Sequence, residues 1–210
     1  MATTTEGPVV LESGDHLTRA EFHRRYEARP DIRKAELVLG VVYVASPTRF
    51  NQHSDPHSLA GTWARVFAAK TPGLRVGEEA TVYLDADNEV QPDVLLFWDP
   101  PRGEGARRRE DDYIEGPPLL VVEVANSSAS YDLYEKKEAY RRAGVPEYIV
   151  WAVRDRRITW LHLRGGEYAA LEPNADDIIE SLVLPGLRLD VQAMLAGDTA
   201  AVLAAIGVRV

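Results

Sequence analysis

The 210-residue sequence contains no cysteine, which excludes disulfides, cysteine-ligated zinc and thiol catalysis. It also lacks an apolar run approaching the roughly 18 residues that a membrane span needs. Its first residues show no basic-then-apolar signal-peptide pattern. Hydrophobic residues make up 45% and charged residues 27%, which is typical of a soluble globular protein. We therefore expect a cytoplasmic protein that does not associate with membranes.

Positive charge is scarce, because the formal net charge is −9. Nucleic-acid binding draws much of its affinity from cationic groups that release counterions, so a nucleic-acid partner requires locally gathered lysine and arginine. Three clusters are candidates: Arg107, Arg108 and Arg109; Lys136, Lys137, Arg141 and Arg142; and Arg154, Arg156 and Arg157. Any one cluster taken alone is more simply explained as solvated surface charge.

No internal repeat or linker divides the chain. Residues 1–14 are expected to form a flexible tail and residues 15–210 a single domain. Thr18-x-x-Glu21 has the pattern of a capping box, which predicts the start of a helix that Pro30 ends.

The remaining pattern is mixed α and β. Strands are expected at 36–44 (two, joined at Gly40), 74–76, 80–84, 90–98, 119–125, 148–153, 158–163 and 168–171; helices at 57–70, 131–143 and 191–206; and a mobile loop at 99–116. The strand–helix–strand unit at 119–153 predicts a right-handed crossover between parallel strands. The fold class is therefore α+β (α/β), with a mixed central sheet flanked by helices.

Two acidic residues are difficult to explain by folding alone. Asp93 follows a proline and, by strand alternation, shares a face with Leu95 and Phe97. Glu123 interrupts the apolar segment 119–125, which is typical of a strand covered on both faces. An ionised carboxylate in such a place is costly unless it is paired or binds a cation.

A lysine accompanies these acids. In the helix at 131–143, helical spacing places Lys136 or Lys137 beside the apolar stripe, within reach of Glu123. Two carboxylates and a lysine in a partly dry cleft suggest phosphodiester hydrolysis, because Mg²⁺ prefers oxygen ligands and can polarise a phosphoryl group. The alternative is a structural ion pair between Glu123 and Lys136, with Asp93 as a turn residue.

The sequence resembles the Uma family of putative restriction endonucleases, a bacterial family in the PD-(D/E)XK superfamily. The resemblance covers about residues 15–190. It rests on Pro92-Asp93, Val121-Val-Glu123-Val and Asp132-Leu-x-x-Lys136-x-x-x-Tyr140-x-x-x-Gly144-Val-Pro-Glu-Tyr148, and also on Glu36-Leu-x-x-Gly40, Ser46-Pro47, His53-x-x-x-His57 and Thr71-Pro-Gly-x-x-Val-Gly77. It implies a restriction-endonuclease-like fold.

The resemblance also implies roles for individual residues. Asp93 and Glu123 would bind the metal, Lys136 rather than Lys137 would be the catalytic lysine, and Glu36 would be a further metal ligand or else a strand-edge surface residue. The superfamily usually has its lysine two residues after the glutamate, where this chain has Ala125. The family moves that lysine onto the following helix.

Several alternatives stay open. His53 and His57 have the i, i+4 spacing of metal ligands, but no third ligand is expected near them, so a helix-start packing or substrate-contact role is favoured. The leading hypothesis is an endonuclease that uses Mg²⁺ or Mn²⁺ to cleave DNA. The oligomeric state is not readable from the sequence, but a homodimer is compatible with this function because two related sites serve duplex cleavage. The alternatives are a catalytically inactive module that binds nucleic acid or protein, and a hydrolase acting on RNA or another phosphate ester.

Overall fold

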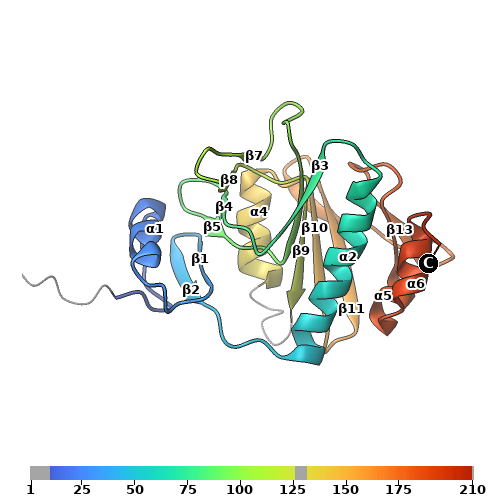
Figure 1. Ribbon diagram of the computed structural model, residues 1–210, viewed down its shortest axis with the longest axis horizontal. Coiled ribbons are helices and arrows are strands. Elements are labelled where there is room, and N and C mark those ends of the chain that lie inside the picture. The colour runs from blue at the N-terminus through green and yellow to red at the C-terminus, as the bar shows by residue number, and fades with distance from the viewer. Residues whose placement is uncertain (1–9, 126–131, 210) are drawn as a thin grey trace, which may run out of the picture.

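The computed structural model describes residues 10–125 and 132–209, and its centre is a mixed sheet with helices on both faces (Figure 1). The strand order is β12-β11-β10-β9-β6-β3. The strands span β3 Leu74–Glu78, β6 Val94–Trp98, β9 Leu120–Ala125, β10 Glu147–Ala152, β11 Arg157–Arg164 and β12 Glu167–Ala170. β9 and β10 are parallel, as the crossover pattern predicted, while the other pairs are antiparallel.

A second sheet lies beside the first and has the order β2-β1-β5-β4-β8-β7. Its strands span β1 Ala35–Val38, β2 Val41–Val44, β4 Val82–Tyr83, β5 Glu89–Val90, β7 Arg107–Arg108 and β8 Ile114–Glu115. A separate hairpin pairs β13 Ile178–Glu180 with β14 Arg188–Asp190.

The helices cover both faces of the central sheet. Their bounds are α1 Arg19–Glu27, α2 Asp55–Ala69, α4 Lys137–Ala143, α5 Val191–Ala196 and α6 Thr199–Ala205, with π-helical turns η1 Phe50–Ser54 and η2 Asp132–Lys136. In Figure 1, α2 runs across one face of the sheet and α4 lies behind the other, with α1 and the α5–α6 pair at opposite ends of the molecule. This arrangement of a mixed sheet between helices matches the predicted fold class.

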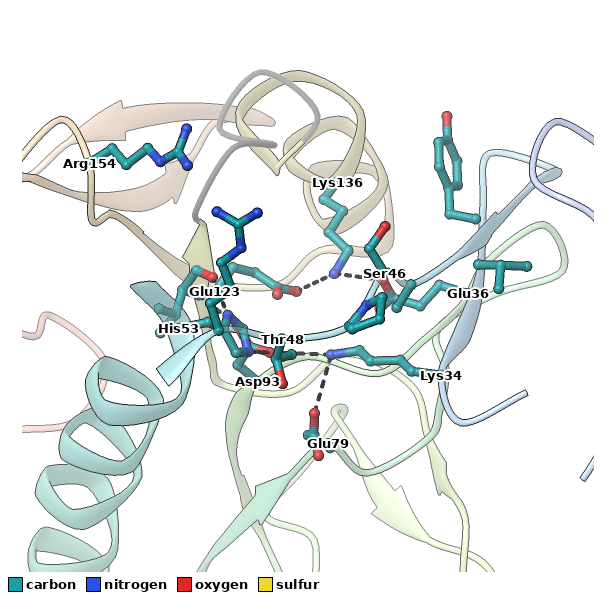
Figure 2. Close-up of a pocket in the computed structure, with 16 residues that line it drawn as sticks. Lys34, Glu36, Ser46, Thr48, His53, Glu79, Asp93, Glu123, Lys136 and Arg154 are labelled. Atoms are coloured by element: carbon teal, nitrogen blue, oxygen red, sulfur yellow. Dashed lines mark hydrogen bonds and ion pairs between the residues drawn. The ribbon is translucent and has the colours of Figure 1, made fainter. Parts of the chain in front are cut away.

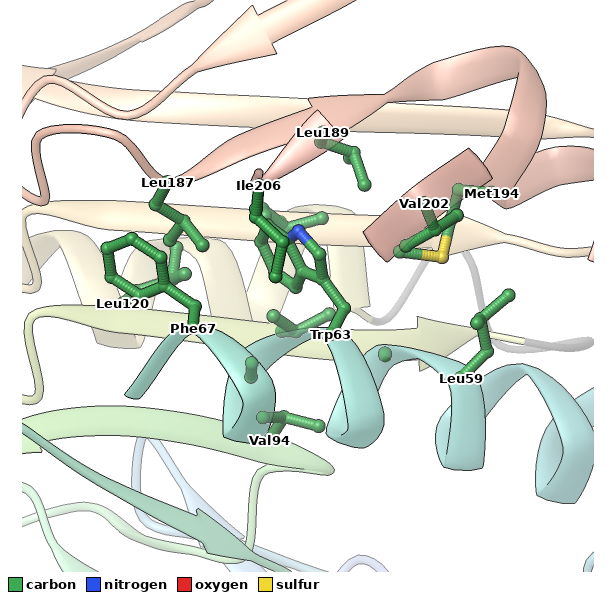
Figure 3. Close-up of a cluster of buried hydrophobic side chains, with 14 of the residues drawn as sticks. Leu59, Trp63, Phe67, Val94, Leu120, Leu187, Leu189, Met194, Val202 and Ile206 are labelled. Atoms are coloured by element: carbon green, nitrogen blue, oxygen red, sulfur yellow. The ribbon is translucent and has the colours of Figure 1, made fainter. Parts of the chain in front are cut away.

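The larger core lies between α2, the central sheet and the C-terminal helices (Figure 3). Trp63 of α2 and Trp160 of β11 meet edge to face with ring centroids 6.0 Å apart, and the Trp63 indole donates to the Arg188 carbonyl oxygen at 2.8 Å. Both indoles are essentially fully buried. Aromatic pairs of this geometry add about 0.5–1.5 kcal/mol beyond area burial. The ring pair therefore fastens α2 to the sheet, and the indole hydrogen bond joins α2 to the C-terminal hairpin.

A second core fills the opposite face and borders the candidate site. It joins side chains of the central sheet, such as Leu95 and Val121, to Tyr140 of α4 and to Val38 and Val90 of the second sheet. These apolar contacts border the polar residues described below and hold the backbone of those residues in place.

One predicted strand is divided. Residues 90–98 were expected to form a single strand, but β5 ends at Val90 in one sheet and β6 begins at Val94 in the other. Pro92 lies at the break, where its missing N–H prevents a continuous ladder. The Gln91 N–H donates to the Glu36 carboxylate at 2.7 Å instead of to a strand neighbour. The prediction of one strand was wrong. Because of the break, Asp93 lies outside both strands, and its side chain lines the candidate site.

Other segments also differ from the expectation. The segment 99–116 contains the paired strands β7 and β8 rather than only loop, and the hairpin β13–β14 was not predicted. The expected helix at 191–206 is two helices, because Gly197 adopts a left-handed conformation (φ 73°) that ends α5. β7 and β8 are two residues long, too short for an alternating pattern to register.

The N-terminal helix follows its predicted signal. The Thr18 hydroxyl accepts a hydrogen bond from the Glu21 N–H at 3.3 Å, which satisfies one of the free backbone donors of the first turn. Of the expected tail, residues 1–9 lie outside the described residues, while Leu11 is buried against the second sheet. Within the described part of the chain, no helix has the length and apolarity to cross a membrane.

Candidate active site

Asp93 stands where β6 begins, at the edge of the pairing with β9. Val94 faces Val122 across the ladder, and beyond this pair the Asp93 Oδ2 accepts the Val124 N–H at 2.7 Å. The carboxylate therefore replaces the ladder acceptor that is lost at the break. Asp93 is only 2% exposed, so its charge requires compensation nearby.

Glu123 lies on the neighbouring strand and is compensated by the helix that follows. Its Oε1 accepts from the Lys136 ammonium at 2.7 Å and from the Tyr140 hydroxyl at 2.8 Å. Lys136 and Tyr140 are one helical turn apart and therefore share a face. Burial and then the Glu123 charge raise the pKa of Tyr140 well above its usual value, which keeps that hydroxyl protonated as a donor.

Glu36 reaches the same lysine from β1 of the second sheet. Its Oε2 lies 3.0 Å from the Lys136 ammonium, and its Oε1 accepts the Gln91 N–H. The residue is 7% exposed. Of the two placements weighed for Glu36, the strand-edge surface residue is wrong: it is a buried member of the cluster. Lys137, the other lysine considered, is partly exposed, whereas Lys136 is 2% exposed.

Lys34 is a site residue that the sequence did not reveal. Its ammonium lies 3.2 Å from Asp93 Oδ1 and 3.8 Å from Glu79 (Figure 2). Burial opposes the charge on Lys34, but the Asp93 and Glu36 carboxylates outweigh it and leave the pKa raised. Burial likewise opposes the Asp93 charge, and Lys34 with His53 outweighs it, so the Asp93 pKa is lowered. The raised pKa of Lys34 and the lowered pKa of Asp93 both indicate that the two residues form an ion pair.

The two histidines lie on the other side of Asp93. His53 Nε2 is 3.5 Å from Asp93 Oδ1, and its Nδ1 donates to the Val124 carbonyl oxygen at 2.9 Å. His57 Nε2 donates to the Asp93 carbonyl oxygen at 2.9 Å. The expectation that no third ligand is close to this pair is wrong, since Asp93 comes from a strand far along the sequence and completes a group of three.

Apart from His57 and Tyr140, the side chains that form this cluster line one pocket with a volume of about 620 Å³ (Figure 2). Its charged lining consists of four cations and four acids: Lys34, Arg49, Lys136 and Arg154, with Glu36, Glu79, Asp93 and Glu123. Figure 2 shows Asp93, Glu123 and Lys136 pointing toward its centre from different elements. The predicted trio is thus brought together, although the pocket also contains charges that the sequence did not indicate.

The three basic clusters named from the sequence differ in their surroundings. Each arginine of the 107–109 cluster contacts an acid, with Arg107 2.6 Å from Glu115. Arg141 and Arg142 pair with Glu138 within α4. Arg154 lines the pocket. The cationic groups at the site therefore come from four separate segments rather than from one basic run.

The donor set fits a divalent cation. Asp93 and Glu123 offer carboxylate oxygens, which Mg²⁺ and Mn²⁺ prefer. The pocket of about 620 Å³ greatly exceeds the roughly 30 Å³ that one water occupies in the liquid. Asp93 faces the Lys34 ammonium and Glu123 faces the Lys136 ammonium. A bound ion would add positive charge beside the same two carboxylates.

The fold belongs to the restriction-endonuclease-like class. The crystal structure of a putative nuclease belonging to DUF820 from Anabaena variabilis superposes with a TM-score of 0.62, covering 78% of this chain and 90% of that one at 13% identity. At that identity the likeness shows the fold alone. No curated protein matches the sequence.

The family follows from the sequence itself. The model of the Uma2 family, described as putative restriction endonuclease, matches residues 19–192. Because the match spans most of the chain, the protein belongs to the Uma2 family. The predicted family and fold are confirmed.

Proposed function

We propose that this protein is a Mg²⁺- or Mn²⁺-dependent endonuclease that hydrolyses phosphodiester bonds in DNA. One observation supports the proposal most: Asp93, Glu123 and Lys136, from three different elements, line one pocket of about 620 Å³. Asp93 and Glu123 would hold the ion. Glu36 lies near them, because its carboxylate contacts the Lys136 ammonium.

Each side chain then has a defined task. The ion, when bound, polarises the phosphoryl group and stabilises its developing charge. Tyr140 and the Val124 N–H hold the two carboxylates in place. The Lys136 ammonium orients the attacking water and stabilises negative charge on the phosphate. Water adds to phosphorus and loses a proton, one P–O ester bond breaks, and the leaving oxygen takes up a proton from solvent, so that overall one proton passes from the water to the leaving group.

The test is cleavage of a supercoiled plasmid with Mg²⁺ or Mn²⁺. We expect wild type to nick or linearise it, and Asp93→Asn or Glu123→Gln to reduce the rate by at least about 10²–10³-fold, the usual effect of losing one electrostatic contact to a transition state. Asp87→Asn and Glu104→Gln are matched controls, because both residues are exposed. Equal rates in the site variants and their controls would contradict the proposal.

A second candidate function is a nuclease-fold module that binds nucleic acid or a protein without cleaving it. The lysines favour it, because Lys34 and Lys136 already neutralise both carboxylates without an ion. Calorimetry separates the two functions. A nuclease should bind Mg²⁺ or Mn²⁺ with loss in Asp93→Asn, whereas the inactive module should bind DNA with the same affinity in the presence of EDTA and take up neither ion.

A further inference from the structure

His53 and His57, which the proposed nuclease chemistry does not use, form a group with Asp93. One nitrogen of each imidazole and one Asp93 oxygen lie within 4.8 Å of one another, and no other set of three potential ligands in the described residues meets this criterion. We propose that this group binds a divalent transition-metal ion that favours nitrogen ligands, of the Co²⁺ or Zn²⁺ type. The inference goes beyond the proposed function and holds whether or not DNA is cleaved.

The orientation of His53 supports a ligand role. Its Nδ1 donates to the Val124 carbonyl oxygen at 2.9 Å, so in the neutral ring Nε2 keeps its lone pair. That Nε2 is 3.5 Å from Asp93 Oδ1. Two ligands at zinc distances of about 2.0–2.1 Å in a tetrahedral site are about 3.3 Å apart. Metal-bound histidines commonly donate the other ring N–H to a carbonyl, which fixes the ring in this way.

His57 is held by a similar bond. Its Nε2 donates to the Asp93 carbonyl oxygen at 2.9 Å, so in the neutral ring Nδ1 has the lone pair for a metal ion. The two imidazole centroids are 5.7 Å apart. The histidines flank the start of α2 at i, i+4 spacing, which places both on one face of the helix. Glu78 approaches His57 Nε2 to 3.8 Å, adding negative charge just outside the group.

The chemistry of the group selects the class of ion. Imidazole nitrogen suits Zn²⁺ and related transition metals, whereas Mg²⁺ prefers oxygen. The side chains of His53 and His57 are 17% and 15% exposed, so an ion can reach them, and His53 lines the pocket. Lys34 contacts the same Asp93 oxygen as His53. The ammonium and the ion therefore compete for that oxygen.

Co²⁺ is a suitable probe, because its visible absorption reports nitrogen ligation. We expect His53→Gln and His57→Gln to weaken Co²⁺ binding by about 100-fold or more, since losing even an outer-shell partner costs about 10–100-fold. The glutamine amide can still donate to the carbonyl that each imidazole bonds. His16→Gln, at an exposed histidine, should bind Co²⁺ as wild type does. Lys34→Met should bind Co²⁺ more tightly.

Two results would overturn the inference: unchanged Co²⁺ affinity in both histidine variants, or a visible absorption spectrum of the Co²⁺-loaded wild type without nitrogen ligation. The wild-type spectrum needs no variant and so decides the matter even if a substitution impairs folding. Glu123→Gln separates this site from the nuclease site, because it should lose cleavage and still give the nitrogen-ligated Co²⁺ spectrum.

Discussion

At the scale of single residues, the Lys136 ammonium holds the site together. It is 2% exposed and lies within 3.0 Å of both Glu36 and Glu123. Removing one partner of a buried ion pair leaves an uncompensated charge and costs about 3–5 kcal/mol. We expect Lys136→Met to lose about that much unfolding free energy in urea denaturation without divalent metal. Mg²⁺ should restore part of it, because an ion can take over the positive charge.

The neighbouring lysine provides the matched control. Lys137→Met makes the same chemical change one residue later, at a partly exposed position, and should alter the unfolding free energy by no more than about 0.5 kcal/mol. Similar losses in the two variants would mean that Lys136 is not the lysine that compensates the two acids.

The sequence predicted the residues that interrupt a local pattern. Asp93 follows a proline, Glu123 breaks an apolar strand, and Lys136 falls on a helix stripe, so each is visible within a few neighbours. Lys34 and the role of His53 were not predictable in this way. Lys34 is 59 residues from Asp93 in the sequence, and nothing in its surroundings indicates that the second sheet carries it there.

At the scale of elements, a buried carboxylate joins α1 to the second sheet. Glu89 of β5 is 1% exposed and accepts from His23 of α1 at 3.0 Å. Its Oε2 has no hydrogen-bond partner among the described residues. Burial raises the pKa of Glu89, and the facing His23 and Arg19 offset this only in part, with Glu27 adding to it. Tyr83 also lies against this His23.

This shift predicts a pH dependence. Because the folded-state pKa is raised, the contribution of Glu89 to stability is complete below its unfolded pKa of about 4.3 and is lost as pH rises through the folded value. We expect Glu89→Gln to gain stability relative to wild type as pH rises from about 4 to 7, measured by urea unfolding at each pH. The exposed Glu172→Gln should show no such trend. A constant difference between Glu89→Gln and wild type would contradict the raised pKa.

An element was predictable from the sequence where its cause lies in residues that are close to it in the chain. The capping box of α1, the left-handed Gly144 that ends α4 and the parallel β9–β10 pair all depend on neighbouring residues or on one helical connection. The division of residues 90–98 between two sheets does not. It depends on β1 supplying Glu36 to the Gln91 N–H, a tertiary contact that strand periodicity does not encode.

At the scale of the whole molecule, the protein is acidic, whereas its pocket lining has no net charge. The net charge is −9, and most arginines outside the pocket face acids on their own or adjoining segments, as Arg142 faces Glu138. Within the pocket lining, cations and acids are equal in number. The pocket lining therefore carries no net negative charge that would repel a phosphate backbone.

This distribution predicts which arginines set the salt dependence of DNA binding. Each phosphate contact contributes about −0.9 to the slope of log K against log salt for duplex DNA. Arg49→Ala and Arg154→Ala should each reduce the magnitude of that slope by about 1 and weaken binding to all sequences alike. Arg142→Ala removes the same charge from an exposed helix pair and should leave the slope unchanged. Fluorescence anisotropy in EDTA over a salt series measures all three, and equal slopes throughout would place the DNA away from the pocket.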